Sequence, residues 1–192
     1  MAVVRNVHER SLTHAAKDVG ALLDSLASPT DRLWPAWRWP AQRFDRPLAV
    51  GASGGHGPIR YFVSAYVAGS RVVYEFTAPH GLVGTHGFDV VPRNVGISVL
   101  RHTLEGTTTG TMRVAWPLVW RPMHDALIED ALDTAAASLA ATPIAKRRLS
   151  AWVRLLRALA WAWVERGHVT AVRSLLEQTS HRTRDGSETN ES

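Results

Sequence analysis

The alternation of apolar and polar positions divides the chain into an early helix, a series of strands and a long late helix. After an extended segment near residues 3–7, apolar side chains recur every three or four positions from Ala15 to Leu26. That spacing places them on one face of a helix. Thr13 is the expected N-cap, and Pro29 is expected to end the helix.

From about residue 41 to residue 116 the pattern changes to short runs of β-forming residues separated by turn residues. Ile59–Val67 is the strongest of these runs. Short runs at intervals of about 8–12 residues, with no helical pattern among them, are typical of an antiparallel sheet and not of a βαβ fold. The expected strands are residues 43–50, 59–67, 71–78, 85–91, 97–104 and 111–116.

A long amphipathic helix is expected from Pro122 to Ala141, because its apolar residues follow a helical spacing. Leu127 belongs to its apolar stripe, and the face expected to be exposed carries Asp125, Glu129, Asp130 and Asp133. A curved antiparallel sheet followed by one long helix predicts an α+β fold with a cavity between sheet and helix. Such a fold can enclose a small apolar molecule.

Two histidines, His86 and His102, are the main candidates for chemistry in the expected sheet. If the turn between their strands is centred near Asn94, they face each other on an otherwise apolar face. Their near-neutral pKa would allow polar contacts with a ligand or proton transfer. A structural hydrogen bond is the alternative. The residues expected to line the cavity are Tyr74, Phe76, His86, Phe88, Leu100, His102, Met112, Val114, Trp116 and Leu127.

Other candidate motifs have simpler explanations. Residues 51–55 match the G-x-S-x-G pattern of a serine nucleophile, but a strand and not a helix is expected after them, so they are interpreted as a turn. We expect no metal site, because His86 and His102 lack an evident third ligand. A tryptophan-rich crossing either caps the cavity or packs as buried aromatic residues; it contains Trp34, Trp37 and Trp39.

Length and charge indicate one domain with a basic extension. The chain has 192 residues and no cysteine, so it has no disulfide framework. We expect a ligand-binding domain at residues 1–142, a basic amphipathic helical extension at 143–179 and a disordered tail at 180–192. The extension holds seven basic and two acidic side chains, whereas residues 1–142 are nearly neutral.

An amphipathic extension needs a surface that covers its apolar stripe. Residues 145–165 could dock on the domain, form a homodimer or lie on an anionic membrane. No known nucleic-acid-binding motif accompanies the basic residues of the extension, so nucleic acid is not an expected partner. The N-terminus lacks a signal-like apolar region, and the longest apolar run, residues 158–164, is much shorter than the roughly 20 residues of a membrane span. We therefore expect a cytoplasmic protein.

Three stretches carry a resemblance to a known family: Arg43-Phe44-Asp45, residues 84–90 (Gly-Thr-His-Gly-Phe-Asp-Val) and residues 116–120 (Trp-Pro-Leu-Val-Trp). With the element order, they make residues 2–141 resemble the START/Bet v 1-like superfamily, which includes polyketide cyclase/dehydrase-like and lipid-transfer proteins. The resemblance implies a helix-grip fold whose cavity binds an apolar or amphipathic molecule, such as a lipid or a polyketide.

The resemblance implies neither a cofactor nor one particular reaction. Ligand binding in the cavity is the expected function. One alternative is a cyclase/dehydrase-type enzyme that uses His86 and His102 as acid and base. The other is an interaction protein that acts through its basic C-terminal helices. Fold alone does not decide among them.

Overall fold

We describe the protein from a computed structural model, in which residues 1–144 and 146–160 are described. Contacts divide the chain into two units, Met1–Arg148 and Leu149–Ser192. In the second unit residues 151–160 are helical. Residues 161–179 of the predicted extension, with Trp163, and the predicted tail at 180–192 lie outside the described residues. The first unit reaches six residues beyond the predicted boundary at 142. Arg147 explains part of this, since its Nε lies 2.7 Å from Asp133 Oδ2.

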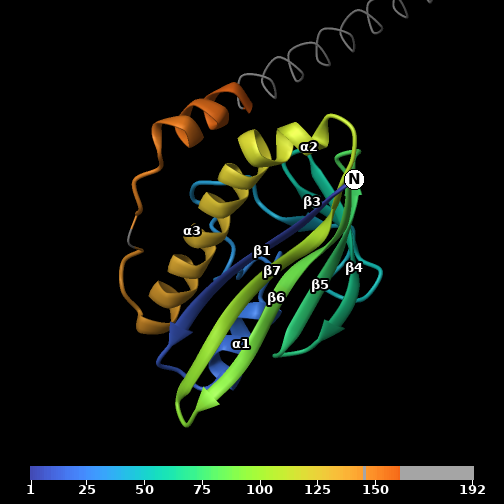
Figure 1. Ribbon diagram of the computed structural model, residues 1–192. Coiled ribbons are helices and arrows are strands. Elements are labelled where there is room, and N and C mark those ends of the chain that lie inside the picture. Colours follow the sequence, from blue (N-terminus) through green and yellow to red (C-terminus); the bar gives the residue numbers. More distant parts are fainter. Residues whose placement is uncertain (145, 161–192) are drawn as a thin grey trace, which may run out of the picture. The chain divides into compact units, whose positions relative to one another are not determined.

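A curved antiparallel sheet forms the body of the first unit (Figure 1). In the described part of the chain it has seven strands in the order β1-β7-β6-β5-β4-β3-β2. With α3 (Arg121–Ala140) it gives the predicted α+β helix-grip architecture. The strands are β1 (Ala2–Leu12), β2 (Arg43–Phe44), β3 (Ser53–His56), β4 (Ile59–Val67), β5 (Arg71–Ala78), β6 (Leu82–Asn94) and β7 (Ile97–Thr108).

The last predicted strand, residues 111–116, is wrong. The structure instead has a short helix α2 (Met112–Ala115) and a π-helical turn η1 (Trp116–Trp120) that lead directly into α3. Met112, Ala115, Trp116 and Trp120 gather around Leu82 and Leu104 in one apolar cluster. Their spacing is that of a helix, so burial of this face outweighs the β-propensity of the intervening residues. β1 takes the free edge of β7, from Ala2↔Thr108 to Leu12↔Ser98.

The hairpin between β6 and β7 differs from the expected register by two residues. Asn94 pairs with Ile97 across the turn, and an irregularity between Pro92 and Asn94 shifts the pairing below it. His86 therefore lies opposite Leu104, and Phe88 lies opposite His102. Because side chains alternate with a period of two, a shift of two residues leaves every side chain on its predicted face. His86 and His102 are thus diagonal neighbours on one face.

Helix α1 (Ala16–Asp24) packs on the sheet through the predicted apolar face, with Val19, Leu22 and Leu23 buried. The expected cap at Thr13 is wrong, because the N-cap is Ala15 and makes no side-chain hydrogen bond. A glycine lets the helix closely approach the turn between β4 and β5: a Cβ on Gly20 would lie 2.2 Å from the backbone oxygen of Gly69.

The polar side of α3 is not an exposed face as predicted. Asp130 is 1% exposed, and its Oδ2 accepts a 2.7 Å hydrogen bond from Trp39 Nε1. Arg38 Nη1 lies 3.1 Å from the same oxygen. Trp37 Nε1 also donates to α3, at 3.2 Å to Thr134 Oγ1. Trp37 and Trp39 of the crossing therefore hold α3 in place, and the structure gives them a packing role.

Asp125, Glu129 and Asp133 lie four residues apart on α3 and face β1. The inner face of β1 carries polar residues that match them, and sequence periodicity could not reveal this pairing. No helix among the described residues is both long and apolar enough to cross a membrane.

Candidate functional site

A cluster of aromatic and imidazole rings lines the sheet face beneath the helices. The His86 ring stacks on Phe76 with 4.6 Å between ring centroids and lies 5.0 Å from Tyr74. The His102 ring meets Phe88 edge-on at 4.8 Å. Since Tyr74, His86 and Phe88 follow one face of neighbouring strands, the alternation of the strands alone brings these rings together.

Helix α3 contributes a third imidazole to this ring cluster. The His124 ring lies 5.0 Å from His102 and 6.2 Å from Trp116. On the other side of His86, the Tyr61 ring of β4 lies 4.8 Å away. The contacts therefore form a continuous path from Tyr61 through His86 and His102 to His124. We call these four residues and Tyr74 the inner ring cluster.

His86 and His102 contact each other through one nitrogen each, with 3.4 Å between His86 Nδ1 and His102 Nε2. In a neutral imidazole one nitrogen carries hydrogen and the other accepts a hydrogen bond. Whichever residue donates in this contact, the two remaining nitrogens are one donor and one acceptor. The pair therefore offers complementary hydrogen-bonding groups to a third molecule.

Several buried polar atoms of the inner ring cluster have no hydrogen-bond partner within the described residues. They are Tyr74 Oη, His86 Nε2, His102 Nδ1 and both ring nitrogens of His124. Tyr74 and His102 are completely buried. Leaving a buried polar group unpaired costs about 1–3 kcal/mol. Natural proteins accept such a cost rarely, and a functional role is one explanation.

Burial keeps the imidazoles of the inner ring cluster neutral. It lowers the pKa of His86 and of His102 well below the usual 6.5, and the nearby His124 adds to both shifts. Burial also lowers the pKa of His124, although Asp125 opposes the shift. The pKa of the Tyr74 hydroxyl is raised well above 10, again mainly by burial. At neutral pH the cluster is uncharged and polar.

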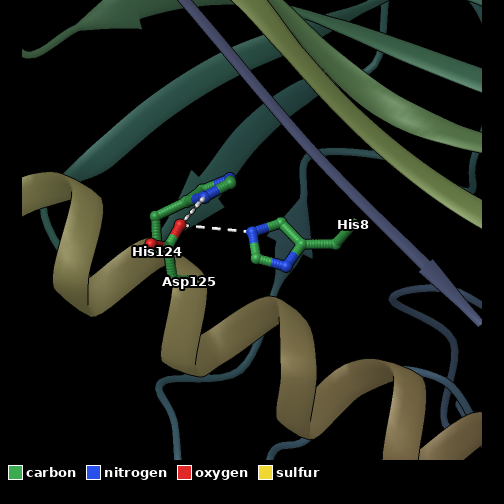
Figure 2. A group of neighbouring side chains, drawn as sticks. All are labelled: His8, His124 and Asp125. Atoms are coloured by element: carbon green, nitrogen blue, oxygen red, sulfur yellow. Dashed lines mark hydrogen bonds and ion pairs between the residues drawn. The ribbon is translucent and has the colours of Figure 1, made fainter.

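The edge of the inner ring cluster becomes ionic where β1 meets α3. His8 Nδ1 lies 2.8 Å from Glu129 Oε1, and His8 Nε2 lies 3.2 Å from Asp125 Oδ1. The hydrogen bond to Asp125 raises the pKa of His8, burial opposes this, and Glu129 adds to the rise. Figure 2 shows His8 and His124 on either side of Asp125. Asn6 Nδ2 donates to the same Asp125 oxygen at 2.8 Å.

Most of the predicted lining residues gather here. Tyr74, Phe76, His86, Phe88, Leu100 and His102 share the inner sheet face, and Leu127 is buried on α3. Met112 and Trp116 are buried too, but on α2 and η1 and not on a strand. Val114 is 63% exposed. Its prediction as a lining residue is wrong, because it lies on the outer side of α2.

Sequence reasoning missed Tyr61, His56 and Gln42. Tyr61 Oη receives a 2.8 Å hydrogen bond from Gln42 Nε2 and lies 3.0 Å from His56 Nδ1. Burial lowers the pKa of His56 to about 3. The alternation of β4 places Tyr61 on the face of Val63, and it could have been found from that signal. Residues 51–55 were interpreted as a turn, whereas Ser53–His56 form β3. The strand expected after them is confirmed as β4, and no helix follows Ser53.

The fold of this chain is similar to that of several solved structures. CalU16 from Micromonospora echinospora is 14% identical, with a TM-score of 0.50, over 85% of this chain and 94% of its own. Norcoclaurine synthase from Thalictrum flavum is also 14% identical, with a TM-score of 0.55, over 74% of this chain and 90% of its own. Ara h 8.0201 is 11% identical, with a TM-score of 0.50, over 72% and 99%.

This chain has the helix-grip fold that its resemblance to START/Bet v 1-like proteins implies. At these identities the likeness shows the fold alone. No protein-family model matches the chain, and no curated protein matches it. Any function must therefore be argued from the inner ring cluster itself.

Proposed function

We propose that this helix-grip domain binds a small amphipathic molecule between the sheet and α3, in contact with the inner ring cluster. The unpartnered polar atoms on Tyr74, His86, His102 and His124 carry the proposal. A ligand hydroxyl or carbonyl would satisfy groups that otherwise cost free energy in the folded protein. The surrounding aromatic rings would cover the apolar part of the same molecule.

The chemistry of the cluster favours a neutral, ring-bearing ligand. Its imidazoles stay uncharged, so they offer no ion pair to an anionic group. The His86–His102 pair presents one donor and one acceptor, which suits a hydroxyl because a hydroxyl can serve as either. The norcoclaurine synthase structure holds dopamine and hydroxybenzaldehyde, two small aromatic compounds with hydroxyl groups. A fold of this kind can therefore hold an aromatic molecule that bears a hydroxyl group.

An acid/base enzyme that uses His86 and His102 is the second proposal. It has support in the imidazole pair, whose contact would let a proton pass from one ring to the other. A general base works best with a pKa near the working pH. Since burial lowers the pKa of both histidines, each would be a weak base at neutral pH. Ligand binding is therefore the better-supported proposal.

Native mass spectrometry of the protein purified from its own host would test the proposal, because a retained ligand would appear as added mass. A second test uses 2-naphthol, a neutral aromatic alcohol, and naphthalene as the matched compound without a hydroxyl. Binding of each is followed by tryptophan fluorescence. We expect 2-naphthol to bind about fivefold more tightly, since one hydrogen bond contributes about 1 kcal/mol.

Tyr74→Phe is the matched protein variant. It removes a buried hydroxyl with no partner among the described residues, so the free energy of unfolding should stay the same or rise. The preference for 2-naphthol over naphthalene should fall in Tyr74→Phe or in His102→Phe. Equal affinity of the natural protein for both compounds, together with no retained ligand, would contradict the proposal.

A further inference from the structure

Among residues 1–144 and 146–160, three side chains come together with the spacing of a metal site: His8 of β1 and His124 and Asp125 of α3. Their candidate ligand atoms all lie within 4.8 Å of one another. Figure 2 shows the two imidazoles converging on the same carboxylate. We propose that this cluster binds a divalent first-row transition-metal ion. The inference goes beyond ligand binding by the inner ring cluster, with which it shares His124, and its test measures the metal ion alone.

The distances come close to those of a coordination sphere. His8 Nε2 lies 3.2 Å and His124 Nδ1 lies 3.8 Å from Asp125 Oδ1. In a tetrahedral site with bonds of about 2.0–2.1 Å, ligand atoms are about 3.4 Å apart. Side-chain movements of a few tenths of an ångström would bring both nitrogen–oxygen distances to that value. Two imidazoles and one carboxylate suit ions such as Zn²⁺, Co²⁺ and Ni²⁺.

The surroundings already hold His8 in the orientation that a metal ligand needs. His8 Nδ1 contacts Glu129 Oε1 at 2.8 Å, so this nitrogen donates its hydrogen and Nε2 turns toward Asp125. A carboxylate on the far nitrogen of a ligating histidine is a common arrangement and fixes its tautomer. Asn6 Nδ2 orients Asp125 by donating a hydrogen bond to its Oδ1. Arg10 Nη2, 3.0 Å from Glu129 Oε2, steadies Glu129 in turn.

The ring of His124 lies beside Asp125, with 3.8 Å from Nδ1 to Oδ1, and a metal ion could use its nitrogens. Both of its nitrogens are buried and lack a hydrogen-bond partner within the described residues. A structural clamp between His8 and its two carboxylates would explain His8 and Asp125, but it gives His124 no role. Three protein ligands would leave a fourth position for another group, as in catalytic metal sites. Because the His124 ring contacts His102, that position would border the inner ring cluster.

Titration of the metal-stripped full-length protein with Zn²⁺ by calorimetry would test the site, with Co²⁺ added in parallel and followed by visible absorption. We expect one equivalent to bind, and the Co²⁺ spectrum to show the intense bands of a tetrahedral site. Asp125→Asn and His124→Gln should each weaken binding at least tenfold. Glu129→Gln removes the carboxylate that orients His8 and also pairs with Arg10 and Arg147, and it should weaken binding about 10- to 100-fold.

His80→Gln is the matched control, because His80 is exposed and lies outside the cluster. Its Zn²⁺ affinity should equal that of the natural protein. Circular dichroism shows whether each variant remains folded, and Asp125→Asn keeps the shape of the side chain if the histidine variant does not fold. Absence of binding at millimolar Zn²⁺ would overturn the proposal. So would an unchanged affinity in folded Asp125→Asn, since the ion would then bind elsewhere.

Discussion

Lowering the pH should destabilise this protein through His102, whose imidazole is completely buried and has a nitrogen without a partner among the described residues. Burial holds its folded-state pKa well below 6.5, so the folded protein does not take up the proton. In the unfolded chain the same imidazole has a pKa of about 6.5. Protons therefore bind the unfolded state more, and stability is lost as the pH falls below that value.

The pKa of the unfolded state sets the upper limit of this effect. At about pH 5 the pH is about 1.5 units below the unfolded pKa, and each unit corresponds to about 1.4 kcal/mol. Between about pH 7.5 and pH 5, His102 should therefore remove up to about 2 kcal/mol from the free energy of unfolding. His86 acts in the same direction. His8 acts in the opposite direction, because its folded-state pKa is raised and its contribution is lost as the pH rises.

Urea unfolding of the natural protein and of His102→Phe at both pH values would measure this contribution. The pH-dependent loss should be smaller in the variant by up to about 2 kcal/mol, and the contributions of His8 and His86 largely cancel in the comparison. Phe88→Leu is the control: it disturbs the packing around His102 but removes no titrating group. An equal pH-dependent loss in His102→Phe and the natural protein would show that His102 takes up its proton in the folded state.

Three further predictions concern stability. Asp130→Ala should lower the free energy of unfolding by about 3 kcal/mol in urea, because Arg38 loses its buried carboxylate, and a loss below about 1 kcal/mol would contradict this. A chain that ends at Thr142 lacks the Arg147–Asp133 pair, so it should melt about 2–4 °C lower than a chain that ends at Arg148. Equal melting temperatures of the two chains would favour the domain boundary at 142. Gly20→Ala should cost about 1–3 kcal/mol despite the helix preference of alanine, because the added Cβ meets the Gly69 backbone, and increased stability would refute that contact.

Much of the fold could be predicted because hydrophobic periodicity is a local property. The runs from Ile59 onward identified four of the seven strands, and the spacing of Leu127 and its neighbours identified α3. The shared face of His86 and His102 was also predictable. The error of two residues in the turn left it intact, since strand faces alternate with a period of two. Local patterns were misleading at residues 111–116, where packing on Leu82 and Leu104 favours a helix.

The tertiary structure alone decided which polar residues meet. His8 and Asp125 are 117 residues apart in the chain, and they meet only because β1 takes the edge of β7 and lies along α3. The acidic residues of α3 have the spacing of a solvent-exposed helix face. Nothing local to the helix shows that β1 and the tryptophan crossing present histidine, arginine and indole groups to them. Contacts of this kind form between residues that are far apart in the chain. The local sequence pattern therefore determined most of the helices and strands, and the tertiary structure determined which polar side chains pair between them.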